Sequence, residues 1–121
     1  MLLDTNILIA YLNGEEKAIK ILSEWKISGK VLFISTISKA EVLALPQLSS
    51  KDIDKIRDFL NNFFSISFDD LIAEKAAFIR RSYKLKLPDA GIAATALVHK
   101  LPLVTRDRQF RKIKEITSIE I

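Results

Sequence analysis

The sequence predicts an α/β protein, built as a three-layer α/β/α sandwich around a mainly parallel sheet. Short apolar runs alternate with segments of helical periodicity throughout the chain, and this alternation is typical of parallel sheets joined by helices. The runs at residues 31–35 and 101–105 are apolar on both faces, as expected for strands covered by helices on two sides. A length of 121 residues, 49% of them hydrophobic, suits one domain over residues 1–121.

The first half of the chain supplies two predicted strands. Residues 1–3 form a minimal first strand, and Asp4, Thr5 and Asn6 offer N-cap residues for a helix over residues 7–12. Apolar residues recur at helical spacing over residues 15–27, and residues 31–35 form the second strand. The segment 38–41, SKAE, matches a capping box at the start of the next helix. Ser49 or Ser50 can cap a further helix after Pro46.

The second half continues the alternation. Residues 63–68 form a third strand, followed by the helix-start acids Asp69 and Asp70 and an amphipathic helix over residues 72–83. Pro88 suits a first helical turn, and the Ala-rich run at residues 90–97 favours a helix. Residues 101–104 form a short buried strand, and residues 116–121 an edge strand.

Four acids fall where strands end or helices begin: Asp4, Glu41, Asp89 and Asp107. In an open parallel sheet these positions share one edge, which is where ligands bind. Each acid also has a local explanation, since Asp4 suits an N-cap, Glu41 completes the capping box and Asp89 complements a helix dipole. A neighbouring amide, Asn6, can hold Asp4 in place by hydrogen bonding.

Composition limits the chemistry of such a site. The chain has no Cys and a single His, which excludes thiolate catalysis, disulfides and a zinc site of Cys or clustered His. Any metal is therefore held by oxygen atoms. No apolar run reaches the length of a membrane span and no basic leader precedes the first strand, so we expect a cytoplasmic location.

The positive charge is concentrated around the last two acids. Residues 80–114 hold ten Lys or Arg against two acids, a net charge of +8 in a chain whose total is +4. Such clusters are often solvated helix faces, yet an acidic centre within a cationic surround also suits a polyanionic phosphodiester. The RNA-binding candidates are Arg81, Lys84, Arg106 and Arg108.

Four segments of this chain resemble the acidic motifs of PIN-domain nucleases, in order: MLLDTNILI, SKAEVL, LPDAGIAATAL and LVTRDRQF. The resemblance covers nearly the whole chain and implies a PIN-like fold. Within that family the short form that opens with LLDTN is most similar to VapC-type toxins of prokaryotic toxin–antitoxin pairs. Carried over by motif, Asp4, Glu41, Asp89 and Asp107 are the catalytic and metal-binding quartet, with Asn6 and Thr105 as polar supports.

The resemblance implies a Mg²⁺- or Mn²⁺-dependent endoribonuclease, and the residues agree with it, because hard divalent cations prefer oxygen ligands. No protein nucleophile is needed when a bound cation activates water. The resemblance also implies a homodimer and a cognate antitoxin that covers the acidic groove. Apolar candidates for contact, which ordinary core packing explains equally well, are Leu43, Leu45, Phe63 and Phe64.

Three other functions are compatible with parts of this pattern. A housekeeping RNA-processing PIN nuclease has the same acids, and a noncatalytic RNA-binding module has the same basic stretch. A receiver-like or haloacid-dehalogenase-like phosphoacceptor also places an Asp after its first strand. That class needs a further nearby acid where this chain has Thr5 and Asn6.

Overall fold

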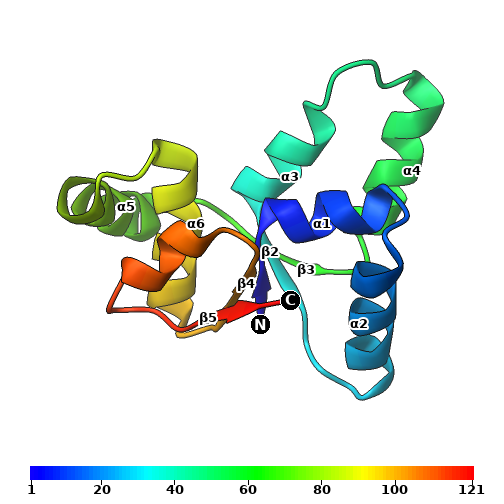
Figure 1. Cartoon of the computed structure of the whole chain (residues 1–121). Helices are drawn as coiled ribbons and strands as arrows, with labels where there is room; N and C mark the ends of the chain where they lie inside the picture. The colour runs from blue at the N-terminus through cyan, green and yellow to red at the C-terminus, as the bar shows by residue number, and fades with distance from the viewer.

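The structure is a computed structural model that describes residues 1–121, and it has one fully parallel five-stranded sheet. The elements in chain order are β1 (Leu2–Leu3), α1 (Thr5–Leu12), α2 (Glu16–Ile27), β2 (Phe33–Ser35), α3 (Thr36–Leu43), α4 (Ser50–Leu60), β3 (Phe64–Ile66), α5 (Asp70–Tyr83), α6 (Leu87–His99), β4 (Leu103–Thr105), a 3₁₀ helix η1 (Arg108–Lys112) and β5 (Ser118–Glu120). Figure 1 shows α5 and α6 on one side of the sheet and α1 to α4 on the other. The predicted three-layer α/β/α architecture is confirmed.

The strand order is β3-β2-β1-β4-β5, so the chain builds outward from β1 in one direction and then in the other. The strand order therefore reverses between β1 and β4, and ligands of open α/β sheets bind beyond the carboxyl ends of the strands at such a switch point. Asp4 follows β1 directly, and Arg106 and Asp107 follow β4. The topology thus brings two of the four predicted acids to one place.

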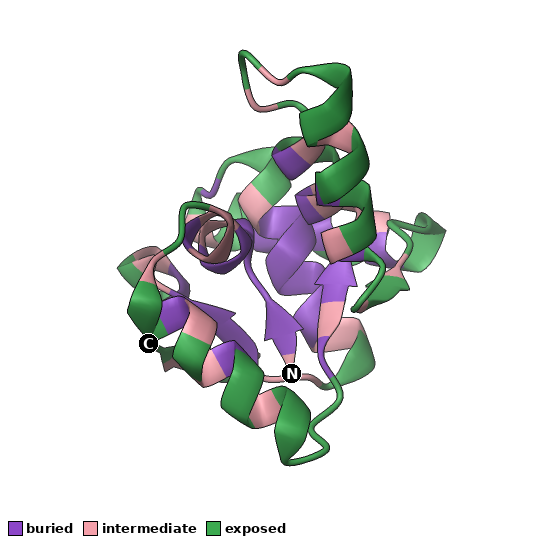
Figure 2. Ribbon diagram, turned by 90° about the vertical axis from the view of Figure 1, so that its right-hand side faces the viewer, coloured by how far each residue is buried: buried purple, intermediate pink, exposed green.

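Two apolar cores lie on opposite faces of the sheet and hold it between the helix layers. Leu2 and Leu103 belong to the core beneath α5 and α6, whereas their neighbours Leu3 and Val104 belong to the core beneath α1 to α4. Successive side chains of a strand point to opposite faces, so the two central strands contribute to both cores. Figure 2 shows these strands as the buried centre of the molecule.

The elements follow the sequence pattern with two differences. The predicted capping box at residues 38–41 is wrong, because α3 begins earlier, with Ser35 as N-cap accepting a hydrogen bond from the Ile37 N–H, and Ser38 lies buried inside the helix. The capping box of this chain is formed instead by Ser49 and Asp52 at the start of α4. The 3₁₀ helix η1 was not predicted; Asp107 is its N-cap and accepts a hydrogen bond from the Gln109 N–H.

A close approach at Gly91 brings α6 against α3. A Cβ atom at Gly91 would lie 2.4 Å from Cδ1 of Ile37 and 3.2 Å from Cε2 of Phe68. Only a residue without a side chain therefore fits here without displacing its neighbours. This approach positions the helix of Asp89 beside the helix of Glu41.

We predict that Gly91→Val lowers the free energy of unfolding by about 1–3 kcal/mol, because the added atoms overpack the α3–α6 contact. Urea unfolding followed by circular dichroism measures the change. The control is Ala77→Val on the exposed side of α5, which adds a β-branched residue without a clash and should cost less than about 1 kcal/mol. Equal losses in the two variants would contradict the steric explanation.

Candidate acidic site at the carboxyl edge of the sheet

Asp4 is the most buried acid of the chain and is fixed at both carboxylate oxygens. It is the N-cap of α1, with 4% of its surface exposed. The Thr5 N–H donates to Oδ1 at 2.8 Å, and the Thr105 hydroxyl donates to Oδ2 at 2.7 Å. An N-cap and a hydroxyl from β4 therefore hold this carboxylate in one orientation.

The Thr105 hydroxyl is the centre of a network that joins β1, α1 and β4. Its oxygen accepts from the Asp107 N–H at 3.0 Å and lies 3.4 Å from Nδ2 of Asn6. Asn6 Oδ1 in turn accepts from the Arg106 N–H at 3.3 Å. The expectation that Asn6 holds Asp4 directly is therefore corrected. Asn6 steadies Thr105 and the backbone after β4, and Thr105 holds Asp4.

Glu41 lies on the exposed side of α3 and is connected to Asp4 through Thr5. The Thr5 hydroxyl donates to Oε1 of Glu41 at 2.7 Å and lies 2.9 Å from Oγ of the buried Ser38. A hydroxyl has a single proton and a carboxylate only accepts, so the Ser38 hydroxyl is left to donate to Thr5. One residue thus holds Asp4 by its backbone and Glu41 by its side chain.

Asp89 and Asp107 share one hydrogen-bond donor, the amide of Gln109. Nε2 of Gln109 lies 3.3 Å from Oδ2 of Asp89 and 2.5 Å from Oδ2 of Asp107. An amide nitrogen carries two protons and can serve two acceptors. Asp89 is in the first turn of α6 and Asp107 begins η1, so Gln109 joins an acid from each of two helix starts.

Burial and neighbouring acids raise the pKa values of two members of the group. The pKa of Asp4 is raised to about 6: burial is the largest cause, the hydrogen bonds from Thr105 and Thr5 oppose it, and the charges of Asp89 and Glu41 add to it. Burial is also the largest cause of the raised pKa of Asp89, followed by the charges of Asp107 and Glu41. The charges of Glu41, Asp89 and Asp107 therefore reach at least one other acid of the group, and they disfavour the ionisation of Asp4 or Asp89.

The donor atoms at this edge are all oxygens, which fits a hard divalent cation and excludes a soft-metal site. No three Asp, Glu or His side chains converge tightly enough to enclose an ion by themselves. That arrangement still suits Mg²⁺, which commonly uses one or two carboxylates and keeps several waters. A cation between the carboxylates would also offset the repulsion that raises the pKa values of Asp4 and Asp89.

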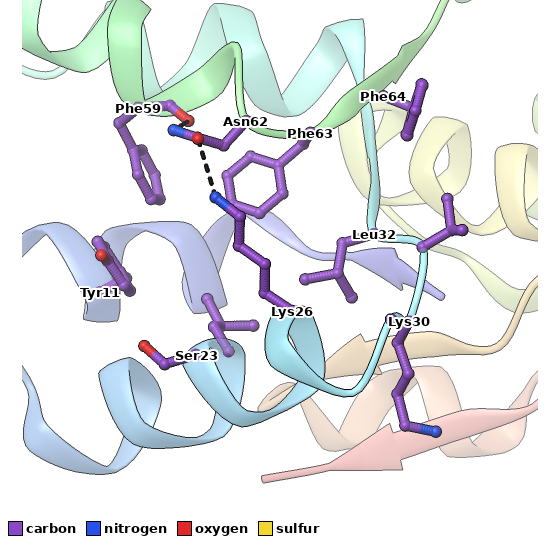
Figure 3. A pocket seen from close by; sticks show the side chains of 12 residues that line it. Tyr11, Ser23, Lys26, Lys30, Leu32, Phe59, Asn62, Phe63 and Phe64 are labelled. Carbon is purple, nitrogen blue, oxygen red and sulfur yellow. Dashed lines mark hydrogen bonds between the residues drawn. The ribbon is translucent and has the colours of Figure 1, made fainter.

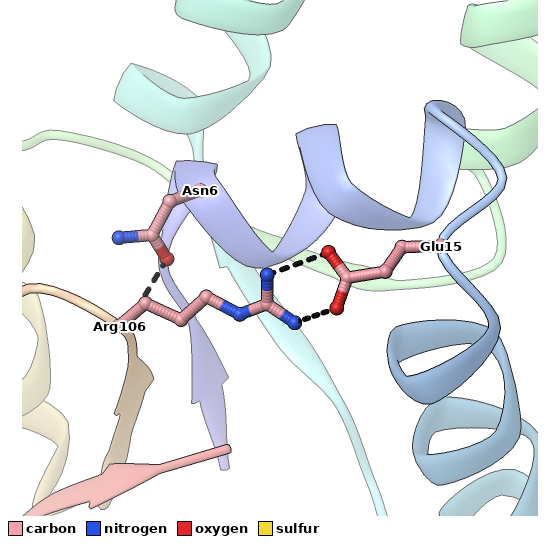
Figure 4. A network of polar contacts seen from close by, with 3 residues as sticks. All are labelled: Asn6, Glu15 and Arg106. Atoms are coloured by element: carbon pink, nitrogen blue, oxygen red, sulfur yellow. Dashed lines mark hydrogen bonds and ion pairs between the residues drawn. The ribbon is translucent and has the colours of Figure 1, made fainter.

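Next to the acids, Arg106 and Glu15 form a two-pronged ion pair, shown in Figure 4. Nη1 of Arg106 donates to Oε2 of Glu15 at 2.6 Å, and Nη2 donates to Oε1. The pair raises the pKa of Arg106 and lowers that of Glu15. It ties the loop after β4 to the start of α2. Arg106, one of four predicted RNA-binding residues, is thus already engaged, whereas Arg81, Lys84 and Arg108 are exposed and form no ion pair.

Sequence reasoning missed four residues of this network: Thr5, Glu15, Ser38 and Gln109. Thr5 had a usable signal, because it directly follows an acid at the end of a strand. No sequence signal pointed to Ser38 or Gln109. Their contacts depend on the exact residue at which a helix starts, and the sequence does not determine that residue. Glu15 is joined to a partner 91 positions away, and sequence spacing carries no information on such a pair.

Comparison with known proteins places the chain in a family. A family model described as PIN domain matches residues 1–116. This chain belongs to the PIN-domain family. Its PIN fold is shared by a chain of a toxin–antitoxin complex from Klebsiella pneumoniae, with 37% identity, a TM-score of 0.83 and coverage of 99% of this chain and 98% of that chain. The predicted family resemblance is confirmed.

Other solved PIN structures support the same fold. A chain of FitAcB from Neisseria gonorrhoeae is 26% identical, with a TM-score of 0.77 and coverage of 98% of this chain and 95% of that chain. A chain of VapBC2 from Rickettsia felis, bound to a promoter DNA fragment, has a TM-score of 0.86 at 20% identity over 99% and 97% of the two chains, which is a likeness of fold. A search among curated proteins gives no match. No helix of this PIN domain is long and apolar enough to cross a bilayer.

We predict that Asp4 makes the metal-free domain less stable as the pH rises from about 4 to about 6, because the pKa of Asp4 is higher in the folded state than the ordinary value of 3.8. Folding favours the protonated acid, so this stabilisation is present below pH 4 and is lost above pH 6. The loss attributable to Asp4 is on the order of 3 kcal/mol.

The measurement compares the parent with Asp4→Asn in a chelating agent, by urea unfolding across this pH range. The comparison uses only the change in the free energy of unfolding with pH. Any loss of stability that the substitution causes equally at every pH therefore cancels. The variant should lose less stability than the parent as the pH rises. Parallel curves for the two proteins would show that Asp4 ionises freely in the folded state.

Proposed function

We propose that this PIN domain is a Mg²⁺- or Mn²⁺-dependent endoribonuclease and the toxin of a toxin–antitoxin pair. The observation that carries the proposal is the set of four acids from separate elements, Asp4, Glu41, Asp89 and Asp107, whose carboxylates interact at one edge of the sheet. Gathering like charges costs stability unless a ligand offsets it. Membership of the PIN family and likeness to toxin–antitoxin structures support the same proposal.

The four acids are the residues that would hold the metal. When bound, the cation would supply the Lewis acidity that makes water a nucleophile at neutral pH and stabilises charge on the leaving oxygen. Asp4 is the fixed member, because Thr5 and Thr105 restrain both of its oxygens. Asp89 and Asp107 are bridged by the amide of Gln109, which leaves both carboxylates other lone pairs.

The positive charge around the acidic site suits RNA as the substrate. Residues 80–114 carry a net charge of +8 around two of the acids, which attracts a phosphodiester backbone toward carboxylates that would otherwise repel it. Arg81, Lys84 and Arg108 are exposed and available. Arg106 has its charge offset by Glu15, so we assign it mainly to shaping the loop after β4.

The proposed partner is an antitoxin that binds an apolar hollow as well as the acidic edge. A hollow of about 380 Å³ lies between α2, the segment before β2 and the end of α4; Figure 3 shows the side chains that line it. Phe63 and Phe64 line it, together with the stacked rings of Tyr11 and Phe59. Of the predicted contact residues, Phe64 is exposed, whereas Phe63, Leu43 and Leu45 are half-buried against the core. Co-expression with the product of the adjoining gene would distinguish the two nuclease functions. A toxin should bind that product as its antitoxin, whereas a housekeeping nuclease should not.

The proposed homodimer is supported by an exposed apolar face on α5. Leu71 and Phe78 are 52% and 43% exposed, and a spacing of seven residues puts them on one side of the helix. Leu87, at the start of the adjacent α6, is also exposed. Burying such a face against its copy would remove apolar surface from water.

We predict that Asp89→Asn abolishes RNA cleavage without unfolding the domain, because it removes a metal ligand and also a repelling charge. The metal-free variant should melt at the same temperature as the parent or higher. Mn²⁺ should raise the melting temperature of the parent more than that of the variant, since a ligand that binds the native state stabilises it. The measurements are thermal melts with and without Mn²⁺ and cleavage of a mixed RNA pool.

The matched control is Asp70→Asn, which removes a helix-start acid of α5 that lies outside the network. It should keep parental cleavage and a parental response to Mn²⁺. Parental cleavage by Asp89→Asn would remove this residue from the site. Binding of RNA without cleavage by the parent, with no response to Mn²⁺, would favour the noncatalytic RNA-binding module.

We also predict that the parent is a dimer at high micromolar concentration and that Leu71→Glu makes it a monomer. Two glutamates would meet across a symmetric interface and would be buried at a cost. Light scattering measures the mass. Ile27→Glu is the control, since Ile27 is 87% exposed on α2, away from α5, and it should leave the dimer intact. A monomeric parent would refute this interface.

A further inference from the structure

A hollow lined by three cations lies in the connection between α5 and α6. It has a volume of about 300 Å³ and is lined by Arg80, Lys84, Leu85 and Lys86. No acid lines it, and none of the three cations takes part in any ion pair of the structure. Charges of one sign therefore gather in a concave place without a protein counter-charge.

The backbone holds the guanidinium of Arg80 in place and sets the conformation of Lys84. Nη1 of Arg80 donates to the carbonyl oxygen of the buried Leu85 at 2.9 Å, which orients its guanidinium across the connection. Lys84 ends α5 in the left-handed conformation, with φ of 57°, and its N–H donates to the carbonyl of Arg80 at 2.9 Å. A Lys in this conformation costs more than a Gly would, so the turn keeps a charge where a small residue would be easier to accommodate.

Lys86 occupies a helix position where a lysine is usually unfavourable. It is the N-cap of α6 and makes no side-chain capping bond. Ser, Thr, Asp and Asn are favoured at this position, and a cation is unfavourable beside the positive end of a helix dipole. Local stability therefore does not account for a Lys here, whereas an anion held in the hollow would offset both charges.

The hollow adjoins the acidic edge through Lys86. Asp89 is three residues further along the same helix start, and the positive charge of Lys86 lowers the pKa of Asp89 against the larger effects of burial and acidic neighbours. The hollow therefore neighbours the proposed reaction centre along the chain, and none of the four carboxylates lines it.

We propose that Arg80, Lys84 and Lys86 form a subsite for one or two backbone phosphates of single-stranded RNA flanking the bond that is cleaved. This subsite rests on the proposed ribonuclease function and names where the substrate is held. We assign it to the backbone, because a hollow lined by three cations and no acid suits the charge of a phosphate. It fixes the direction in which the strand crosses the carboxylates.

The test measures binding of a fluorescein-labelled 12-nucleotide single-stranded RNA by anisotropy, in a chelating agent, over a series of salt concentrations. Each phosphate contact to a single strand contributes about 0.7 to the slope of log K against log salt. Lys84→Gln/Lys86→Gln should lower the magnitude of that slope by about 0.7 if one phosphate is held and by about 1.4 if two are held, and each single variant should lower it by no more than about 0.7. Arg80 is left intact, because its bond to Leu85 also supports the fold.

The matched control is Lys20→Gln/Lys51→Gln, which removes the same charge from exposed positions on α2 and α4 and should leave the slope unchanged. An unchanged slope in Lys84→Gln/Lys86→Gln, or an equal loss in the control, overturns the subsite. Cleavage of RNA by the parent is scored separately. Cleavage with an unchanged slope refutes the subsite alone, and a lowered slope without any cleavage refutes the nuclease while the phosphate site stands.

Discussion

The hydrogen bond from the Thr105 hydroxyl to Asp4 is the interaction on which the acidic edge depends. It joins residues 101 positions apart, directly beyond the two central strands where the strand order reverses. With the Thr5 N–H on its other oxygen, the carboxylate stays satisfied although it is almost fully buried. A buried acid without such donors would be costly, so the fold and the site are stabilised by the same contacts.

The pairing of β1 with β4 fixes the rest of the acidic edge. The Asp107 N–H donates to the Thr105 hydroxyl at the end of β4. Two residues further on, the Gln109 amide donates to Asp89 at the start of α6. On the other side, Thr5 reaches Glu41 on α3, and the contact at Gly91 sets α3 against α6. Polar bridges thus connect carboxylates that repel one another. Burial is the largest cause of the raised pKa values of Asp4 and Asp89, and the neighbouring acids, whose charge a bound cation would offset, raise them as well.

Sequence reasoning recovered the layers and the places of Asp4, Asp89 and Asp107, because alternation of apolar runs and the edge rule for parallel sheets depend on local pattern and topology. Glu41, expected at the start of its helix, lies in the second half of α3. Sequence reasoning failed at Ser38, where the S-x-x-E spacing indicated a cap but the strand ended three residues earlier at Ser35. Local spacing does not specify where a buried strand stops. It also assigned the support of Asp4 to the nearby Asn6 when the donor is Thr105, because sequence proximity says nothing of contacts across the sheet.

If the four acids form a site for a hard divalent cation, the cation can be located by an anomalous difference map from crystals of the parent grown with Mn²⁺. We expect a peak in contact with the Asp4 carboxylate and at least one of Asp89, Glu41 and Asp107, because only oxygen donors meet there. A map without a peak at this edge, in crystals saturated with Mn²⁺, would contradict it.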